Sequence, residues 1–95
     1  MDPKAANERR TVHYQGHVQG VGFRYTVQRI ASGFAVAGYV QNLADGRVRM
    51  VAEGRTQELD GFLETIRSEM AQYIRNINTE SSPAIGEFDD FEIRH

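Results

Sequence analysis

The stretch RTVHYQGHVQGVGFRYTVQRIASGF, residues 10–34, decides the fold because its apolar spacing changes in the middle. Up to Val18, apolar and polar side chains alternate, and a period of two indicates a half-buried β-strand. From Phe23 to Phe34 the apolar residues recur every three or four positions, as they do on one face of a helix. Gly33 is predicted to cap this helix at its C-terminal end. The stretch therefore predicts a strand, a glycine-rich connection and a helix.

The segment VAGYVQNLADGRVRMVAE, residues 36–53, predicts a β-hairpin, because Asp-Gly is a common turn pair. A two-residue turn would place Val40 opposite Val51 and would mix polar and apolar side chains on both faces. A three-residue loop, residues 44–46, sorts the two faces if Gly46 takes the left-handed conformation. We prefer this second register. It groups on one face Gly38, Val40, Asn42, Val48, Met50 and Ala52.

The segment after the hairpin predicts a second helix. Thr56 is predicted to be its N-cap, and an apolar stripe follows at helical spacing. The stripe consists of Leu59, Phe62, Leu63, Ile66 and Met70. Gly61 lies inside this helix, where a glycine costs roughly 1 kcal/mol relative to alanine.

Two more segments predict strands. In YIRNINTE, residues 73–80, Ile74 and Ile77 break the alternation, which indicates a β-bulge. FDDFEIRH, residues 88–95, predicts a short last strand. The order of elements favours an α+β fold, the ferredoxin-like split βαβ sandwich. In this fold an antiparallel sheet carries two helices packed on one face.

The bulk properties limit the classes of function. The 95 residues suit one domain, which we place at residues 9–95, after a disordered tail at residues 1–8. The absence of cysteine excludes disulfides, a thiolate nucleophile and a cysteine metal site. A net charge of −2 argues against a nucleic-acid partner. With no membrane-length apolar run and no secretion signal at the start, we expect a cytoplasmic monomer with no membrane partner.

The loop QGHVQGVGFR, residues 15–24, is suited to binding an anion. Glycines bring backbone N–H groups together and let a ligand approach them, and the helix start adds its own unpaired N–H groups. Arg24 follows at the loop exit, and its planar fork can bond two oxygens of a phosphate or carboxylate. The alternative is a plain connector followed by a surface arginine.

A second polar residue points to the same place. In the preferred register Asn42 ends its strand on the face that the helices cover, near the start of the first helix. Its amide can hold a water molecule in a fixed orientation. The alternative is a turn-flanking asparagine that bonds its own backbone. The histidines predict no metal site, because His13 and His17 lie roughly 13 Å apart along their strand.

With both blocks in view, the chain resembles an acylphosphatase over about residues 10 to 95. The loop matches the family's first block at Gly16, Val18, Gln19, Gly20, Val21, Phe23 and Arg24. The hairpin matches the second block at Gly38, Tyr39, Val40, Asn42, Asp45 and Gly46. Two long blocks at the expected separation are a far stronger signal than a lone glycine loop.

The resemblance implies the ferredoxin-like fold and metal-free hydrolysis of a small-molecule acyl phosphate to a carboxylate and phosphate, without a cofactor. By the same resemblance, Arg24 binds the phosphoryl group and Asn42 orients the attacking water. The implied phosphate-binding loop supplies the backbone of His17, Val18, Gln19, Gly20, Val21 and Gly22. An acyl phosphate loses a carboxylate that needs no protonation, so a general acid is dispensable, and positioning and charge dominate such transfers.

The chain also departs from the family's pattern. Gln41 stands where relatives often carry a basic residue, residues 70–76 lack the usual Gly-Pro-containing loop, and His95 replaces a terminal tyrosine. Two other functions remain open. One is an accessory domain that binds phosphorylated or carbamoylated ligands, although a chain of this length is expected to leave no room for a partner domain. The other is an RNA-binding module, which the missing aromatic and basic strand motif argues against.

Overall fold

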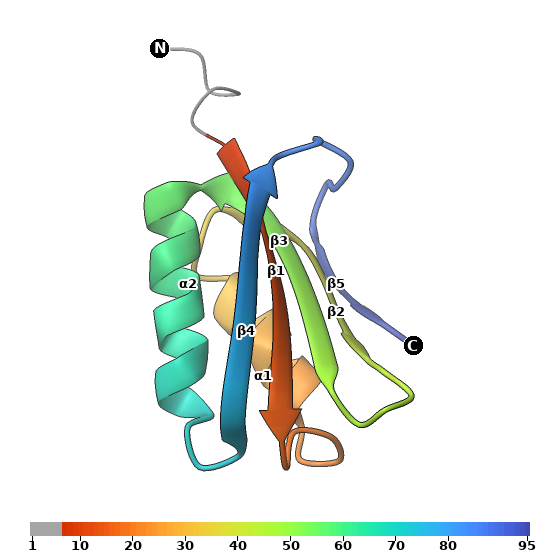
Figure 1. Ribbon diagram of the computed structural model, residues 1–95. Helices are drawn as coiled ribbons and strands as arrows, with labels where there is room; N and C mark the ends of the chain where they lie inside the picture. Colours follow the sequence, from red (N-terminus) through yellow and green to blue (C-terminus); the bar gives the residue numbers. More distant parts are fainter. Residues whose placement is uncertain (1–6) are drawn as a thin grey trace.

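The computed structural model of the protein describes residues 7–95. The elements, in chain order, are β1 (Asn7–Gly16), α1 (Phe23–Ala31), β2 (Val36–Asn42), β3 (Val48–Arg55), α2 (Thr56–Glu69), β4 (Ile74–Pro83) and β5 (Phe91–Arg94). The sheet order is β4-β1-β3-β2-β5, and both helices pack on one face of the sheet (Figure 1). Of the predicted tail, residues 1–6 lie outside the described residues, whereas Asn7 and Glu8 belong to β1.

The sheet is mixed rather than wholly antiparallel. The pairs β1–β3, β1–β4 and β2–β3 are antiparallel, as predicted, but β5 pairs in parallel with β2. The reason is the connection after β4: residues 84–90 pass over one end of the sheet to its other edge (Figure 1). The chain then runs alongside β2 in the same direction. An alternating pattern predicts a strand but carries no information about its direction.

The core lies between the sheet and the helices, and it confirms the predicted inward faces. The strands contribute Val12, Tyr14, Val40, Val48, Met50 and Ala52, and the helices contribute Phe23, Val27, Ile30, Leu59, Phe62 and Ile66. Burying these apolar side chains is the main favourable contribution to folding. No helix among residues 7–95 is long and apolar enough to cross a membrane.

The hairpin takes the register that the three-residue loop predicts. Asn42 pairs with Val48 and Val40 pairs with Met50, while the φ of Gly46 is 93°, in the left-handed region. The predicted bulge is also present, because the pairing of β1 with β4 shifts between Gln15 and Gly16. These two features fix where β2 ends and where β1 enters the glycine-rich loop.

Both predicted helix caps are wrong. Thr56 is the first residue of α2 and Arg55 is the N-cap. The hydroxyl of Thr56 instead donates to the carboxylate of Glu8 at 2.6 Å. Gly33 is not among the glycines with positive φ, and its N–H donates to the carbonyl oxygen of Ile30 at 3.0 Å. The helix therefore ends in a tight turn that any residue can adopt.

Gly61 has a packing role that explains a glycine inside a helix. A Cβ at this position would lie 2.7 Å from a ring carbon of Phe34. The glycine lets that ring approach the helix backbone and stack beside Phe62, with ring centroids 6.1 Å apart. Packing of the Phe34 ring between α2 and the segment after α1 thus offsets the unfavourable helix propensity of Gly61.

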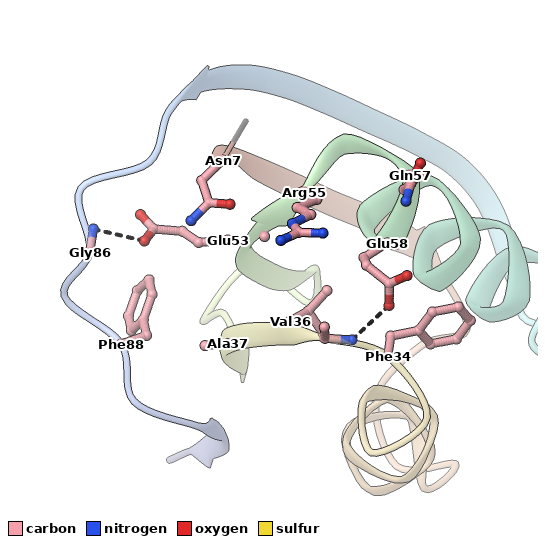
Figure 2. Close-up of a pocket in the computed structure, with 12 residues that line it drawn as sticks. Asn7, Phe34, Val36, Ala37, Glu53, Arg55, Gln57, Glu58, Gly86 and Phe88 are labelled. Atoms are coloured by element: carbon pink, nitrogen blue, oxygen red, sulfur yellow. Dashed lines mark hydrogen bonds between the residues drawn. The ribbon is translucent and has the colours of Figure 1, made fainter. Parts of the chain in front are cut away.

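Glu53 fastens the crossing segment, residues 84–90, to the sheet. Its side chain is 8% exposed and accepts hydrogen bonds from the N–H groups of Ile85 and Gly86, both at 2.9 Å. Figure 2 shows the bond from Gly86. The Nε of Arg9 donates to the same carboxylate at 2.8 Å. Burial opposes ionisation of Glu53, but the two amides and Arg9 outweigh it and lower its pKa.

We expect Glu53→Gln to lower the free energy of unfolding by about 1–3 kcal/mol at pH 7, because a neutral amide replaces a buried charged acceptor. The pKa of Glu53 is lower in the folded state, so its stabilisation is complete above the unfolded value of about 4.3. The stabilisation is lost as the pH falls through the folded pKa. Urea unfolding at pH 7 measures the loss of stability in Glu53→Gln. The same measurement below pH 4 shows whether the difference from the wild type becomes smaller. Glu87→Gln, which removes the more exposed partner of Arg9, is the control with a smaller effect.

Candidate functional site

A hollow of about 200 Å³ lies where the loop after β1 meets the start of α1. Its walls come from Val18, Gly20 and Gly22 of the loop, from the first turn of α1 and from Asn42 at the end of β2. The last part of the chain closes it with Ile93 and His95. The loop, the first helix and the hairpin therefore converge on one space, as the sequence predicts.

The loop presents unpaired backbone amides to this hollow. Gly20 and Gly22 have φ values of 80° and 76°, and a Cβ on either would meet no atom within 4 Å. Gly22 is also the N-cap of α1, whose first turn contains no acidic residue and no side-chain cap. Among residues 7–95, the amides of residues 18–22 donate no hydrogen bond. Such a row of donors at a helix start is suited to an anion.

Three side chains hold the loop in this shape. Val18 is fully buried, and Phe23 is 2% exposed with its ring against Tyr14, at a centroid distance of 5.1 Å. The Nε2 of Gln19 donates to the carbonyl oxygens of Leu43 and Arg47, each at 2.9 Å. The loop is thereby tied both to the core and to the β2–β3 hairpin, so its amides are positioned before any ligand arrives.

We expect Gln19→Ala to raise the dissociation constant for inorganic phosphate and to lower any turnover at this site by about tenfold, because small displacements of a positioning group are costly. Gln19→Glu is expected to be worse, since a carboxylate would face the two carbonyl oxygens. Phosphate titration followed by NMR measures the first effect. An alanine variant with unchanged affinity would show that the hairpin contact does not position the loop.

Arg24 lies in the first turn of α1 with part of its guanidinium engaged. Its Nη1 donates to the carbonyl oxygen of Arg94 at 3.1 Å and lies 3.4 Å from the Nδ1 of His95. In the described chain, its Nε and Nη2 have no partner. That edge of the fork presents two parallel N–H groups, the geometry that binds two oxygens of one anion. A cation at a helix N-terminus is unfavourable by itself, and a bound anion removes that penalty.

Asn42 borders the same hollow from the end of β2. Its Oδ1 is buried and, within residues 7–95, has no hydrogen-bond partner. A buried amide oxygen without a partner is destabilising by about 1–3 kcal/mol. The fold therefore gains nothing from this carboxamide, which leaves it free to bind a ligand or a water molecule.

Not all of the predicted loop residues reach the hollow. Val18, Gly20 and Gly22 border it, whereas the side chain of Gln19 braces the loop and Val21 packs against the core. The N–H of His17 donates to the carbonyl oxygen of Tyr73 at 2.8 Å, and His17 does not border the hollow. The structure thus separates His17 from the other predicted site residues.

Four residues that border the hollow were not predicted as site residues: Phe23, Tyr25, Ile93 and His95. Phe23 is buried in the core beside Tyr14. The sequence could have indicated Tyr25, since it follows Arg24 directly and lies off the apolar stripe of its helix. Ile93 and His95 reach the site only because β5 pairs in parallel with β2, which no local pattern indicates. Among the described residues, no group of three or more His, Cys, Asp or Glu side chains could hold a metal ion.

A larger hollow of about 760 Å³ lies at the other end of the sheet (Figure 2). Its carboxylates already have structural partners, because Glu53 binds the amides of residues 85 and 86 and Glu58 accepts from the N–H of Ala35 at 2.8 Å. The smaller hollow combines free amide donors, a free guanidinium edge and an unpartnered carboxamide. It is therefore the stronger candidate despite its size.

Comparisons with known proteins show which family this chain resembles over most of its length. The acylphosphatase family model matches residues 10–93. An acylphosphatase from Paenarthrobacter aurescens is 43% identical over 86 residues, which cover 90% of this chain and 92% of the relative. The crystal structure of an acylphosphatase from Bacillus subtilis superposes with a TM-score of 0.84 at 32% identity, covering 93% of this chain and 99% of that one. Full-length HypF in a phosphate- and nucleotide-bound form gives a TM-score of 0.80 at 27% identity; 94% of this chain matches 12% of that chain.

Proposed function

Because the chain belongs to the acylphosphatase family and is a hydrolase of that class, we propose that the hollow beside Arg24 binds and hydrolyses an acyl phosphate. The phosphoryl group binds against the loop amides of residues 18–22, excluding that of His17. The free Nε and Nη2 edge of Arg24 bonds two phosphoryl oxygens. The observation that carries this proposal is the convergence of three loop residues with Arg24 and Asn42 on one hollow; the three are Val18, Gly20 and Gly22.

In the proposed reaction, Asn42 holds a water molecule in line with the bond to be broken. The water oxygen attacks phosphorus, and the bond between phosphorus and the bridging acyl oxygen breaks. The carboxylate leaves with the electron pair, and both protons of the attacking water end on the phosphate product, which departs as dihydrogen phosphate before it equilibrates with solvent. Phosphoryl transfer of this kind depends on positioning and on neutralising charge on the phosphoryl oxygens. The loop amides and Arg24 supply that charge stabilisation.

Neither a metal ion nor a general acid is part of this proposal. Because the leaving carboxylate is stable as an anion, its departure requires no proton. Arg24 and the helix start supply positive charge where other phosphoryl-transfer enzymes use metal ions. We further propose that the chain acts as a cytoplasmic monomer on a small molecule, and sedimentation of the purified protein tests the oligomeric state.

The likeness to a small part of HypF keeps a binding function without turnover as the second candidate. An assay with benzoyl phosphate in the presence of a chelator separates the two. Hydrolysis above the buffer rate that chelator does not reduce supports the proposed function. Phosphate binding without hydrolysis would favour the second candidate, and activity that requires an added divalent metal ion would refute the metal-free mechanism.

A further inference from the structure

We propose that the ring of Tyr25 forms the subsite for the acyl group, and that the chain prefers acyl phosphates whose acyl group is apolar and aromatic. This inference rests on the proposed function, since it assumes that the phosphoryl group binds beside Arg24. It adds the part of the substrate on the other side of the bridging oxygen.

Tyr25 leaves an aromatic ring in solvent at the border of the hollow. Its side chain is 71% exposed, and the only other exposed large apolar side chain among the described residues is Ile85. The buried residues of α1 are Phe23, Val27, Ile30 and Ala31, so Tyr25 faces away from the core. An aromatic ring beside a binding hollow offers a contact surface for an apolar ligand group.

The position of Tyr25 fits the chemistry of the substrate. Arg24 and Tyr25 are consecutive and both border the hollow. The acyl carbon is joined to phosphorus through a single bridging oxygen, so it must lie close to the bound phosphoryl group. The polar groups of the hollow are used by the phosphoryl group and the attacking water. Of the apolar side chains that border the hollow, Val18 and Phe23 are buried in the core, so the apolar surface that remains is that of Tyr25 and Ile93.

The charges around the hollow also select among acyl groups. Of the described residues that border it, Arg24 is the one permanent cation, and it is occupied by the phosphoryl group in our proposal. Arg94 lies next in sequence to the bordering His95, but its guanidinium stacks 4.0 Å above the ring of Tyr39 instead. A second anionic group on the acyl portion would therefore find no second arginine or lysine at the hollow. We therefore expect an uncharged acyl group to be preferred.

The test compares kcat/KM for benzoyl phosphate with kcat/KM for acetyl phosphate. We expect Tyr25→Ala to lower the benzoyl-to-acetyl ratio about three- to tenfold, the range that an aromatic contact supports. Tyr25→Phe should keep the wild-type ratio, because the ring and not the hydroxyl makes the contact. Ile85→Ala is the matched control, since it removes an equally exposed apolar side chain at the other end of the sheet and should leave the ratio unchanged.

Several results would overturn the inference. These are an unchanged ratio in Tyr25→Ala, an equal fall in Ile85→Ala, a loss in Tyr25→Phe, or faster wild-type turnover of succinyl phosphate than of acetyl phosphate. An inactive wild-type protein would refute the proposed function instead. The subsite is then tested by binding of benzoylphosphonate and acetylphosphonate, which are not hydrolysed at the phosphorus–carbon bond. Tighter benzoylphosphonate binding that is lost in Tyr25→Ala supports the subsite, and equal binding of the two compounds refutes it.

Discussion

Arg24→Ala is expected to lower kcat/KM for benzoyl phosphate by on the order of a thousandfold or more, as for other arginines that stabilise a transferring phosphoryl group. The loop amides and the helix start remain in this variant, so binding of inorganic phosphate should weaken but persist. The variant loses the pair of parallel N–H donors on Nε and Nη2, which bind two phosphoryl oxygens at once. Arg24→Lys should recover only part of the rate, because an ammonium group is a point charge without a fork.

The matched control for Arg24 is Arg29→Ala, on the same helix. Arg29 is exposed and pairs with Glu69 across the helix layer, away from the hollow. Its removal changes the net charge by the same amount, so any general electrostatic effect on substrate attraction appears in both variants. Steady-state kinetics at constant ionic strength measures the difference. If Arg24→Ala kept more than a tenth of the wild-type rate, the guanidinium could not be the main phosphoryl ligand.

The parts of the site that could be predicted are those encoded by local spacing. The change of period at Phe23 and the glycines before it place a loop at the start of a helix. The position of Asn42 follows from the register of the hairpin, and the loop length around Gly46 determines that register. Each of these signals lies within a few residues of the feature it predicts, so one sequence is enough to read it.

Contacts between distant segments could not be predicted in the same way. The sequence does not indicate that the N–H of His17 donates to the carbonyl oxygen of Tyr73, because this bond depends on the bulge that brings β4 beside the loop. The contact of Arg24 with the carbonyl of Arg94 depends on the parallel pairing of β5 with β2. Both contacts decide which donors of the site are free, and both arise from the sheet topology.

The prediction for Asn42 separates the positioning of water from the binding of phosphate. We expect Asn42→Ala to lower kcat by about a hundredfold, the usual loss when one positioned polar group is removed from an active site. The inhibition constant for inorganic phosphate should change less than about threefold, because the loop amides and Arg24 still bind the anion. Gln41→Ala is the control, since Gln41 lies on the opposite face of the same strand and contacts Arg49.

The stability of the same variant provides an independent measurement. The Oδ1 of Asn42 is buried without a partner in the described chain, so the fold does not depend on it. Urea unfolding of Asn42→Ala should therefore show a midpoint equal to or above that of the wild type, although kcat has fallen. If Asn42→Ala were slow because its fold was disrupted, its urea midpoint would be lower than that of the wild type. If phosphate binding disappeared together with turnover in a stable variant, Asn42 would be a phosphate ligand, and the attacking water would have to be oriented by the loop amides.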